Sequence, residues 1–129
     1  MSLMELQPGS HVGSYTVRRR IGAGGMGEVW EAEDTLLHRR VALKVLKPAV
    51  SVDEESRARL LREARTAAQL NHPNIATIHS MEQQNDAVLI VMEFVEGEPL
   101  SQVIARGAVP EADVCAIGRG VCAALSAAH

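Results

Sequence analysis

The sequence lacks the features that mark nucleic-acid-binding and membrane proteins. The sequence contains thirteen Lys and Arg residues and sixteen Asp and Glu residues, which gives a net charge of −3 at pH 7. It therefore has no cationic excess for binding nucleic acid or anionic lipid. The longest apolar run, residues 87–92, is far shorter than the roughly 18 residues that a membrane-spanning helix needs. The N-terminus has neither the basic start nor the apolar stretch of a signal peptide. We therefore expect a cytoplasmic protein with no nucleic-acid or membrane contact in this segment.

Cysteine is also scarce. Cys115 and Cys122 lie seven residues apart in a segment of helical pattern, and an isolated helix cannot bridge them. We predict that both are reduced packing residues. The five histidines show no ligand-like spacing with cysteines or carboxylates, so the sequence predicts no metal site built from its own side chains. Arg18 to Arg20 and the pair Arg39 and Arg40 are expected to be solvated strand and turn residues, because consecutive strand residues point to opposite faces.

The pattern of apolar residues predicts an α+β fold of one domain. Ser51 and Glu54 fit a capping box, which predicts a main helix from there to about Leu70. Five segments have the composition of strands and predict one five-stranded antiparallel sheet: 15–21, 28–34, 39–46, 75–81 and 87–94.

After Gly97 the sequence becomes helical in character, with a short helix predicted over 100–105 and a longer one beginning near Pro110. The longer helix carries an apolar stripe that nothing else in the chain is expected to cover, which predicts poor solubility or dependence on a partner. The stripe consists of Val114, Ile117, Val121 and Leu125.

Three glycines, Gly22, Gly24 and Gly27, form a Gly-x-Gly-x-x-Gly pattern that allows a backbone to close over phosphates. The same pattern opens the helix of a dinucleotide-binding βαβ unit, and a glycine-rich turn without a ligand is a further interpretation. Residues 28–34 alternate between polar and apolar, which predicts a strand rather than a helix after the last glycine. The pattern therefore favours a hairpin that binds the phosphates of a nucleoside triphosphate.

Lys44 and Glu63 are predicted to form an ion pair. Ala42 and Lys44 share one side of a strand, and Glu63 is expected on the same inward helix face as Ala64 and Ala67. A buried carboxylate needs a cationic partner, and Lys44 is the obvious candidate. The alternative is that both side chains are solvated at the surface.

The chain also contains His-Pro-Asn-Ile at residues 72–75 and Val-Met-Glu-Phe-Val at residues 91–95. Taken together, these motifs resemble the N-terminal lobe of a bacterial eukaryotic-like serine/threonine protein kinase. The resemblance implies an N-terminal extension over 1–11, an ATP-binding lobe over 12–95, and the hinge exit with the first helices of an incomplete C-terminal lobe over 96–129. The residues that carry it are 22–29, 41–44, Glu63, His72 to Ile75 and 91–95.

The resemblance also implies the residues of the site. Lys44 would hold the α- and β-phosphates of ATP while Glu63 holds Lys44, which makes both catalytic candidates. Met92 matches the gatekeeper at the back of the pocket, and the alignment leaves open a ribose contact by Glu98. The loop residues at the phosphates would be Gly22, Ala23, Gly24, Gly25 and Gly27. The apolar residues around the adenine would be Ile21, Val29 and Ala42. Glu93 and Val95 would present backbone groups to the adenine.

The implied activity is transfer of the γ-phosphate of ATP to serine or threonine hydroxyls of a protein substrate. The sequence contains no His-Arg-Asp, Asp-Phe-Gly or Ala-Pro-Glu motif, so the catalytic loop and the ligands for the expected Mg²⁺ are absent. We therefore expect an inactive fragment of a longer parent, which could carry a membrane anchor farther along. The alternative is a stand-alone, non-catalytic nucleotide-binding or protein-interaction module.

Overall fold

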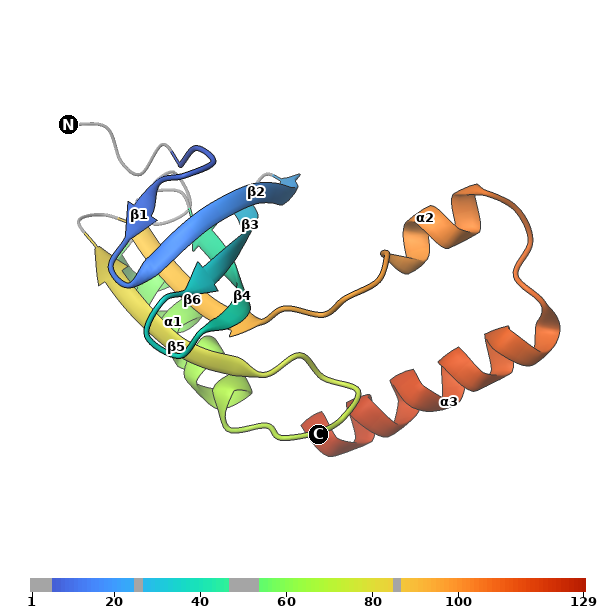
Figure 1. The fold of residues 1–129 in the computed structure, drawn as a ribbon. Helices are drawn as coiled ribbons and strands as arrows, with labels where there is room; N and C mark the ends of the chain where they lie inside the picture. The colour runs from blue at the N-terminus through green and yellow to red at the C-terminus, as the bar shows by residue number, and fades with distance from the viewer. Residues whose placement is uncertain (1–5, 25–26, 47–53, 85–86) are drawn as a thin grey trace.

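The fold is an antiparallel sheet with one helix packed on it and two helices that extend away from it (Figure 1). The computed structural model describes residues 6–24, 27–46, 54–84 and 87–129. In these ranges the six strands are β1 (His11–Val12), β2 (Tyr15–Gly24), β3 (Gly27–Asp34), β4 (Arg39–Leu46), β5 (Ile78–Gln84) and β6 (Ala87–Glu93). The helices are α1 (Glu54–Ala68), α2 (Leu100–Ala105) and α3 (Glu111–Ala128).

The predicted α+β class is confirmed, and the sheet order is β1-β2-β3-β4-β6-β5. The sheet contains one strand more than predicted, which is β1. This strand was not predicted because it pairs only two residues with β2, and so short a segment carries no periodic pattern. The strand predicted over 75–81 begins instead at Ile78. Its expected first residue belongs to a turn, in which the Ile75 amide donates to the carbonyl oxygen of His72 at 3.1 Å. The predicted N-cap Ser51 lies outside the described residues.

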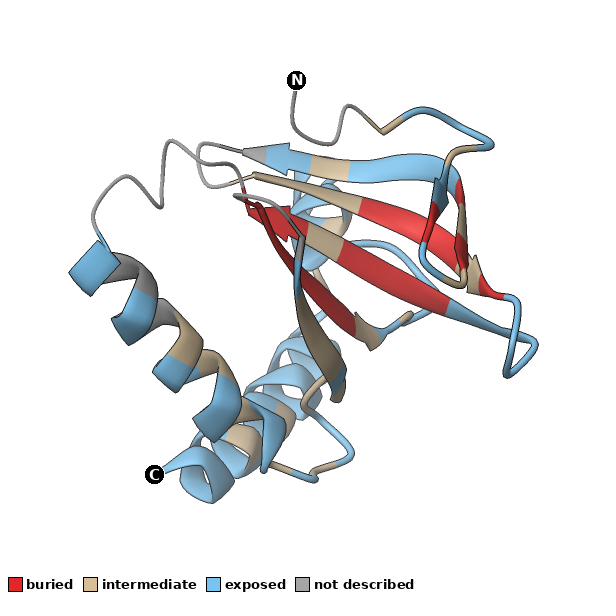
Figure 2. Cartoon of the chain, turned by 90° about the vertical axis from the view of Figure 1, so that its left-hand side faces the viewer, coloured by how far each residue is buried: buried red, intermediate tan, exposed pale blue. Residues whose placement is uncertain are grey.

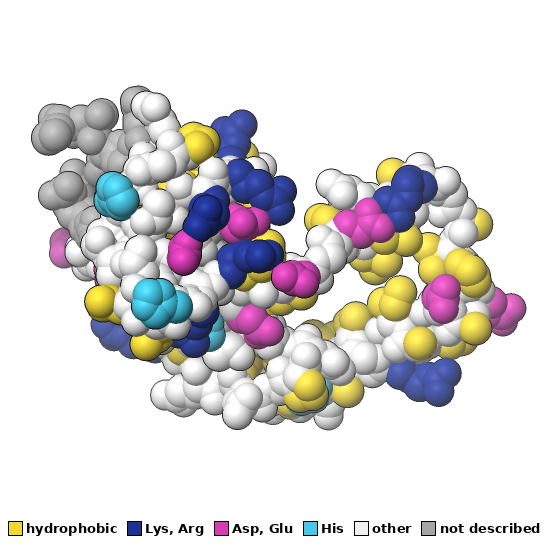
Figure 3. Space-filling model, in the orientation of Figure 1, with side chains coloured by type: hydrophobic (Ala, Val, Ile, Leu, Met, Phe, Trp, Pro, Cys, Tyr) yellow, Lys and Arg dark blue, Asp and Glu magenta, His cyan; other side chains and the backbone are white. Residues whose placement is uncertain are grey.

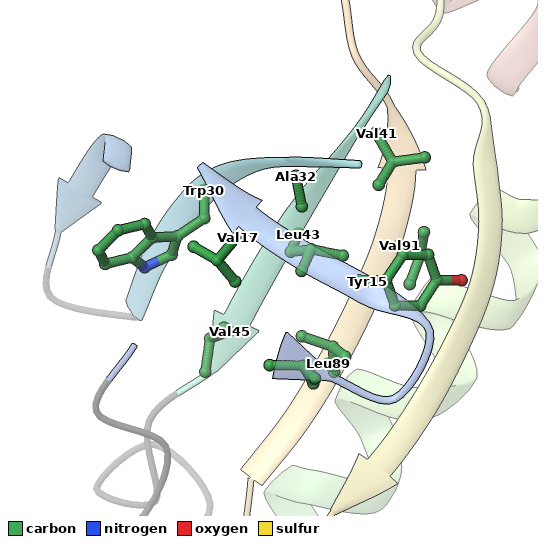
Figure 4. Packing of buried hydrophobic residues seen from close by; sticks show 10 residues of the cluster. Tyr15, Val17, Trp30, Ala32, Val41, Leu43, Val45, Leu89 and Val91 are labelled. Carbon is green, nitrogen blue, oxygen red and sulfur yellow. The ribbon is translucent and has the colours of Figure 1, made fainter. Parts of the chain in front are cut away.

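One face of the sheet forms the main hydrophobic core (Figure 4). On β4, Val41, Leu43 and Val45 point into this core, so the alternation of strand residues places Ala42 and Lys44 on the opposite face. Figure 2 shows that burial is concentrated in the strands. The buried residues of the cluster are Val12, Tyr15, Val17, Trp30, Ala32, Val41, Leu43, Val45, Leu89 and Val91.

The opposite face of the sheet is covered by α1. Leu61 and Ala64 of the helix pack with Leu46 of β4 and with Val88 and Ile90 of β6. Ile78 and Met81 of β5 complete this second cluster. Lys44 therefore lies on the same sheet face as the helix.

Helices α2 and α3 follow an extended segment that leaves the sheet after β6, and α3 then turns back toward it (Figure 1). Asn74, in the connection between α1 and β5, donates from its side-chain amide to the carbonyl oxygen of Gly120 in α3 at 3.2 Å. Neither helix contains a buried residue. The predicted apolar stripe of α3 is exposed, with 38% to 53% of each residue accessible: Val114, Ile117, Val121 and Leu125.

Leu89 offers a direct test of the core. It is fully buried, so we expect Leu89→Ala to lower the free energy of unfolding by about 2–5 kcal/mol through lost apolar burial and a residual cavity. Urea unfolding followed by circular dichroism measures this change. The matched control is Leu36→Ala, because Leu36 is 75% exposed and should change stability by less than about 0.5 kcal/mol. Equal effects of both substitutions would contradict the assignment of the core.

Gly27 tests the close approach of the glycine hairpin to β4. Its φ is 152°, and a Cβ added there would overlap the carbonyl oxygen of Val45 and lie 3.0 Å from the carbonyl carbon. We expect Gly27→Ala to destabilise the fold by about 1–3 kcal/mol, because the clash is with backbone. Gly22→Ala is the control, since the nearest atom to its Cβ would be Cβ of Val29 at 3.9 Å. Thermal unfolding of both variants gives the comparison, and an unperturbed Gly27→Ala protein would refute the steric argument.

Candidate functional site

The strand register brings four of the predicted site residues onto one face of the sheet. Val29 of β3 pairs with Lys44 of β4, and Ala42 pairs with Met92 of β6. Residues paired across antiparallel strands share a face, as do residues two apart on one strand. Ala42 is buried, and the other three are half-buried. The result is an apolar surface that includes a lysine ammonium group.

The glycines extend this surface by one strand. Gly22 of β2 pairs with Val29, so Gly22, Val29 and Lys44 lie in one row across three strands. Two strand spacings separate Gly22 from Lys44, which is about 10 Å. Ala23 and Gly24 continue the pairing to Glu28 and Gly27 across the hairpin, whereas Gly25 lies outside the described residues.

The antiparallel hairpin formed by β2 and β3 excludes the dinucleotide-binding interpretation of the glycines. In a βαβ unit the last glycine would open a helix. Here it opens strand β3. The prediction of a hairpin is therefore confirmed.

Two further predicted residues, Ile21 and Val95, lie at a groove of about 490 Å³ between β2 and the segment after β6. Val95 is 63% exposed and Ile21 is 41% exposed, so both present apolar side chains at the groove. Figure 3 shows this side of the molecule as a hollow between the strands and α2, with charged side chains on both walls. The other lining residues are Arg19, Arg20, Phe94, Glu96, Gly97, Glu98, Pro99 and Gln102.

Glu93 is tied to the start of β5 by two hydrogen bonds. Its backbone amide donates to the carbonyl oxygen of Thr77 at 2.7 Å, and its carboxylate accepts from the Thr77 amide at 3.0 Å. Only the backbone of Glu93 was expected to contact a ligand. The structure gives its side chain a structural role, and the backbone carbonyl contact with a ligand stays a prediction.

In this conformation Glu63 does not pair with Lys44, so the catalytic role of the pair stays a prediction. Glu63 is exposed, and no ion pair joins it to Lys44 in the part of the chain that the structure describes. Leu61 and Ala64 are the α1 residues packed on the sheet, and successive helix residues are 100° apart, so Glu63 points away from it. Glu63 instead lines a shallow groove of about 400 Å³ with Arg59, Arg62, Thr66, Ala67 and Leu70.

Glu98, considered for the ribose, is engaged by Arg106 at the end of α2. Both carboxylate oxygens accept hydrogen bonds from the guanidinium at 2.5 Å. This pairing lowers the pKa of Glu98 and raises the pKa of Arg106. A ribose hydroxyl at Glu98 would have to share an acceptor that Arg106 already occupies.

An ion-pair network that was not predicted from the sequence starts beside the groove. The carboxylate of Glu31 on β3 is only 11% exposed and accepts a hydrogen bond from Nε of Arg19 at 2.9 Å. Nη1 of Arg40 donates to Oε1 of Glu96 at 3.1 Å. The sequence did contain one indication that this carboxylate is enclosed, because Glu31 lies between Trp30 and Ala32 in the predicted strand.

No group of three or more His, Cys, Asp or Glu side chains among the described residues could hold a metal ion. None of the helices in the described ranges is long and apolar enough to cross a membrane. His79 has a lowered pKa, chiefly because of burial and then because of the nearby positive charge of Arg39. It lies on β5, at the opposite edge of the sheet from the glycine hairpin.

Comparison with known proteins identifies the family. The protein kinase domain family matches residues 15–129. Serine/threonine-protein kinase PknD of Mycobacterium tuberculosis is 44% identical over 124 residues, which cover 95% of this chain and 19% of PknD. PknA of the same organism is 50% identical over 99 residues, covering 73% of this chain and 23% of PknA. The chain thus spans about a fifth of the length of these relatives.

Solved structures agree with this match. The crystal structure of the Mycobacterium tuberculosis PknI kinase domain carrying two substitutions superposes with a TM-score of 0.87 at 37% sequence identity. The superposition covers 98% of this chain and 51% of that kinase domain. This chain contains the glycine hairpin, the row of Gly22, Val29 and Lys44, and the groove beside Val95. It belongs to the protein kinase domain family.

Proposed function

We propose that this chain is the ATP-binding portion of a serine/threonine protein kinase. The parent would transfer the γ-phosphate of ATP to serine or threonine hydroxyls of a protein substrate. The observation that carries the proposal is the row of Gly22, Val29 and Lys44, which puts a flexible backbone, an apolar side chain and a cation side by side. Membership of the kinase family supports it.

The sheet face fits an adenine nucleotide. Val29, Ala42 and Met92 offer an apolar surface for the base, and Ile21 and Val95 extend it at the groove. The base would receive its hydrogen bonds from backbone groups, the amide of Val95 and the carbonyl of Glu93, which apolar side chains cannot supply.

The phosphates would lie toward the glycine hairpin. Backbone amides of the hairpin, from Gly22 to Gly27, would donate to the phosphate oxygens, and Lys44 would balance the charge of the α- and β-phosphates. Close packing of Gly27 on β4 keeps the turn end of the hairpin beside the strand that carries Lys44. The amides and the cation therefore approach the same end of the nucleotide.

Glu63 can hold the Lys44 ammonium group only if α1 adopts another orientation. Its carboxylate has to reach the Lys44 ammonium group to hold it, and Glu63 is exposed in the described conformation. We propose that α1 turns toward the sheet in the active parent. Lys44 is half-buried on the face that α1 covers, so rotation of the helix would bring the two side chains together.

Phosphoryl transfer requires more than this nucleotide site. It needs a residue that accepts the hydroxyl proton and ligands for Mg²⁺, which neutralises charge on the phosphates. The described residues offer no metal-binding cluster, and the sequence holds none of the kinase catalytic-loop motifs. We assign those functions, and recognition of the protein substrate, to the part of the parent that lies outside this sequence. No observation favours a stand-alone, non-catalytic module.

Substitution of Lys44 tests the proposed phosphate contact. In the parent kinase we expect Lys44→Met to lower phosphate transfer at least about 100-fold, because the methionine is of similar length and removes the charge that stabilises the phosphates. Transfer from radiolabelled ATP to a protein substrate measures the loss. Arg18→Gln serves as control, since Arg18 is an exposed residue paired with Glu33 on the same sheet. Wild-type turnover by Lys44→Met would show that the lysine is assigned wrongly.

The 129-residue chain by itself should bind ATP and transfer no phosphate to a generic serine/threonine substrate. Equilibrium titration with a fluorescent ATP analogue measures binding, and incorporation of labelled phosphate measures transfer. Turnover that disappears in the Lys44→Met chain would contradict the assignment of the catalytic groups to the rest of the parent.

A further inference from the structure

Arg40 connects the sheet to the segment that follows β6, residues 94–99, which we call the hinge. From β4, its Nη1 donates to Oε1 of Glu96 at 3.1 Å. Its guanidinium carbon also lies 5.1 Å from the centre of the Phe94 ring, within the range of a cation–π contact. Arg40 thus contacts the residues on both sides of Val95.

A nearly enclosed carboxylate places Arg40 there. Oε2 of Glu31 lies 4.0 Å from Nε of Arg40, and Oε1 of the same carboxylate accepts from Nε of Arg19. Only 11% of the Glu31 side chain is exposed, and Arg19 and Arg40 provide the cationic partners that a buried carboxylate requires. Arg19 in turn lines the groove that contains Val95. The network therefore runs from β2 through β3 and β4 to the hinge.

Apart from Arg40, the hinge is held at its far end, where Glu98 pairs with Arg106 and the Pro99 carbonyl oxygen accepts hydrogen bonds from α2. Outside helices and strands, the described residues 94–98 neither donate nor accept a backbone–backbone hydrogen bond. Phe94 and Glu96 contact Arg40 and also line the groove. Val95 lies between these two anchored residues and lines the same groove.

We propose that Arg40 is a positioning residue for nucleotide binding, which holds Phe94 and Glu96 and thereby keeps the backbone of Val95 in place at the groove. This inference rests on the proposed function, in which that amide binds the adenine. An exposed ion pair alone contributes little. Arg40 combines a hydrogen bond to Glu96, a ring contact and the charge of Glu31, so its loss should release the hinge.

The first test compares nucleotide affinities of the whole chain. Arg40→Gln and Glu96→Gln should each weaken binding of a fluorescent ATP analogue about three- to tenfold. The double variant should bind no more weakly than Arg40→Gln, because each single substitution already breaks the contact. Arg18→Gln is the matched control and should stay within about twofold of wild type, since its partner Glu33 is not part of the network. Affinities at the wild-type value, or penalties that multiply in the double variant, would overturn the inference.

The second test measures the backbone mobility of the hinge in the absence of nucleotide. Backbone ¹⁵N order parameters of Phe94, Val95 and Glu96 should fall in Arg40→Gln and recover in part in Arg40→Lys, which keeps the charge but loses the planar fork. Unchanged order parameters in Arg40→Gln would refute the role of Arg40 in holding the hinge. Nucleotide binding by wild type with equal affinity in Arg40→Gln would refute only this inference. Absence of binding by wild type would refute the proposed function, and the order parameters would still decide whether Arg40 anchors the hinge.

Discussion

The register of β2, β3, β4 and β6 is the constraint on which the candidate site depends. It places Val29, Ala42, Lys44 and Met92 on one face because Val41, Leu43 and Val45 are buried on the other. A slip by one residue would move the apolar side chains of β4 to the outside, at a cost of several buried side chains. The core therefore fixes the position of the lysine as firmly as it fixes the strand. The close packing of Gly27 against Val45 adds the glycine hairpin to the same arrangement.

Much of this fold could be predicted from local patterns. Strand β4 was predicted over 39–46 and is found there, because apolar residues that favour strands fill residues 41–46 apart from Lys44. Helix α2 agrees as well, at Leu100–Ala105. The features that were missed are ones without a local pattern: β1 contains two residues, and the start of β5 depends on a turn that extends to Ile75. The placement of Val29 beside Lys44 depends on the register between β3 and β4, which was not predicted.

The errors in the site concern contacts between separate elements. The rotation of α1 depends on which residues pack on the sheet, and Leu61 with Ala64 turns Glu63 outward. Periodicity within the helix could not choose between neighbouring faces, because small and apolar residues occur on more than one of them. The arginines of β2 and β4 were expected to be solvated, and their side chains are half exposed. What the pattern could not reveal is the enclosed carboxylate of Glu31, whose partners come from strands on either side.

The central claim is that one sheet face and the adjoining groove form the nucleotide site. The most direct measurement is a titration of the ¹⁵N-labelled chain with ATP, followed by amide chemical shifts. The account predicts the largest shifts at Gly22, Val29, Lys44 and Val95, with little change at Val121 in α3. Shifts centred on Arg62 and Thr66, which line the groove on α1, would contradict it.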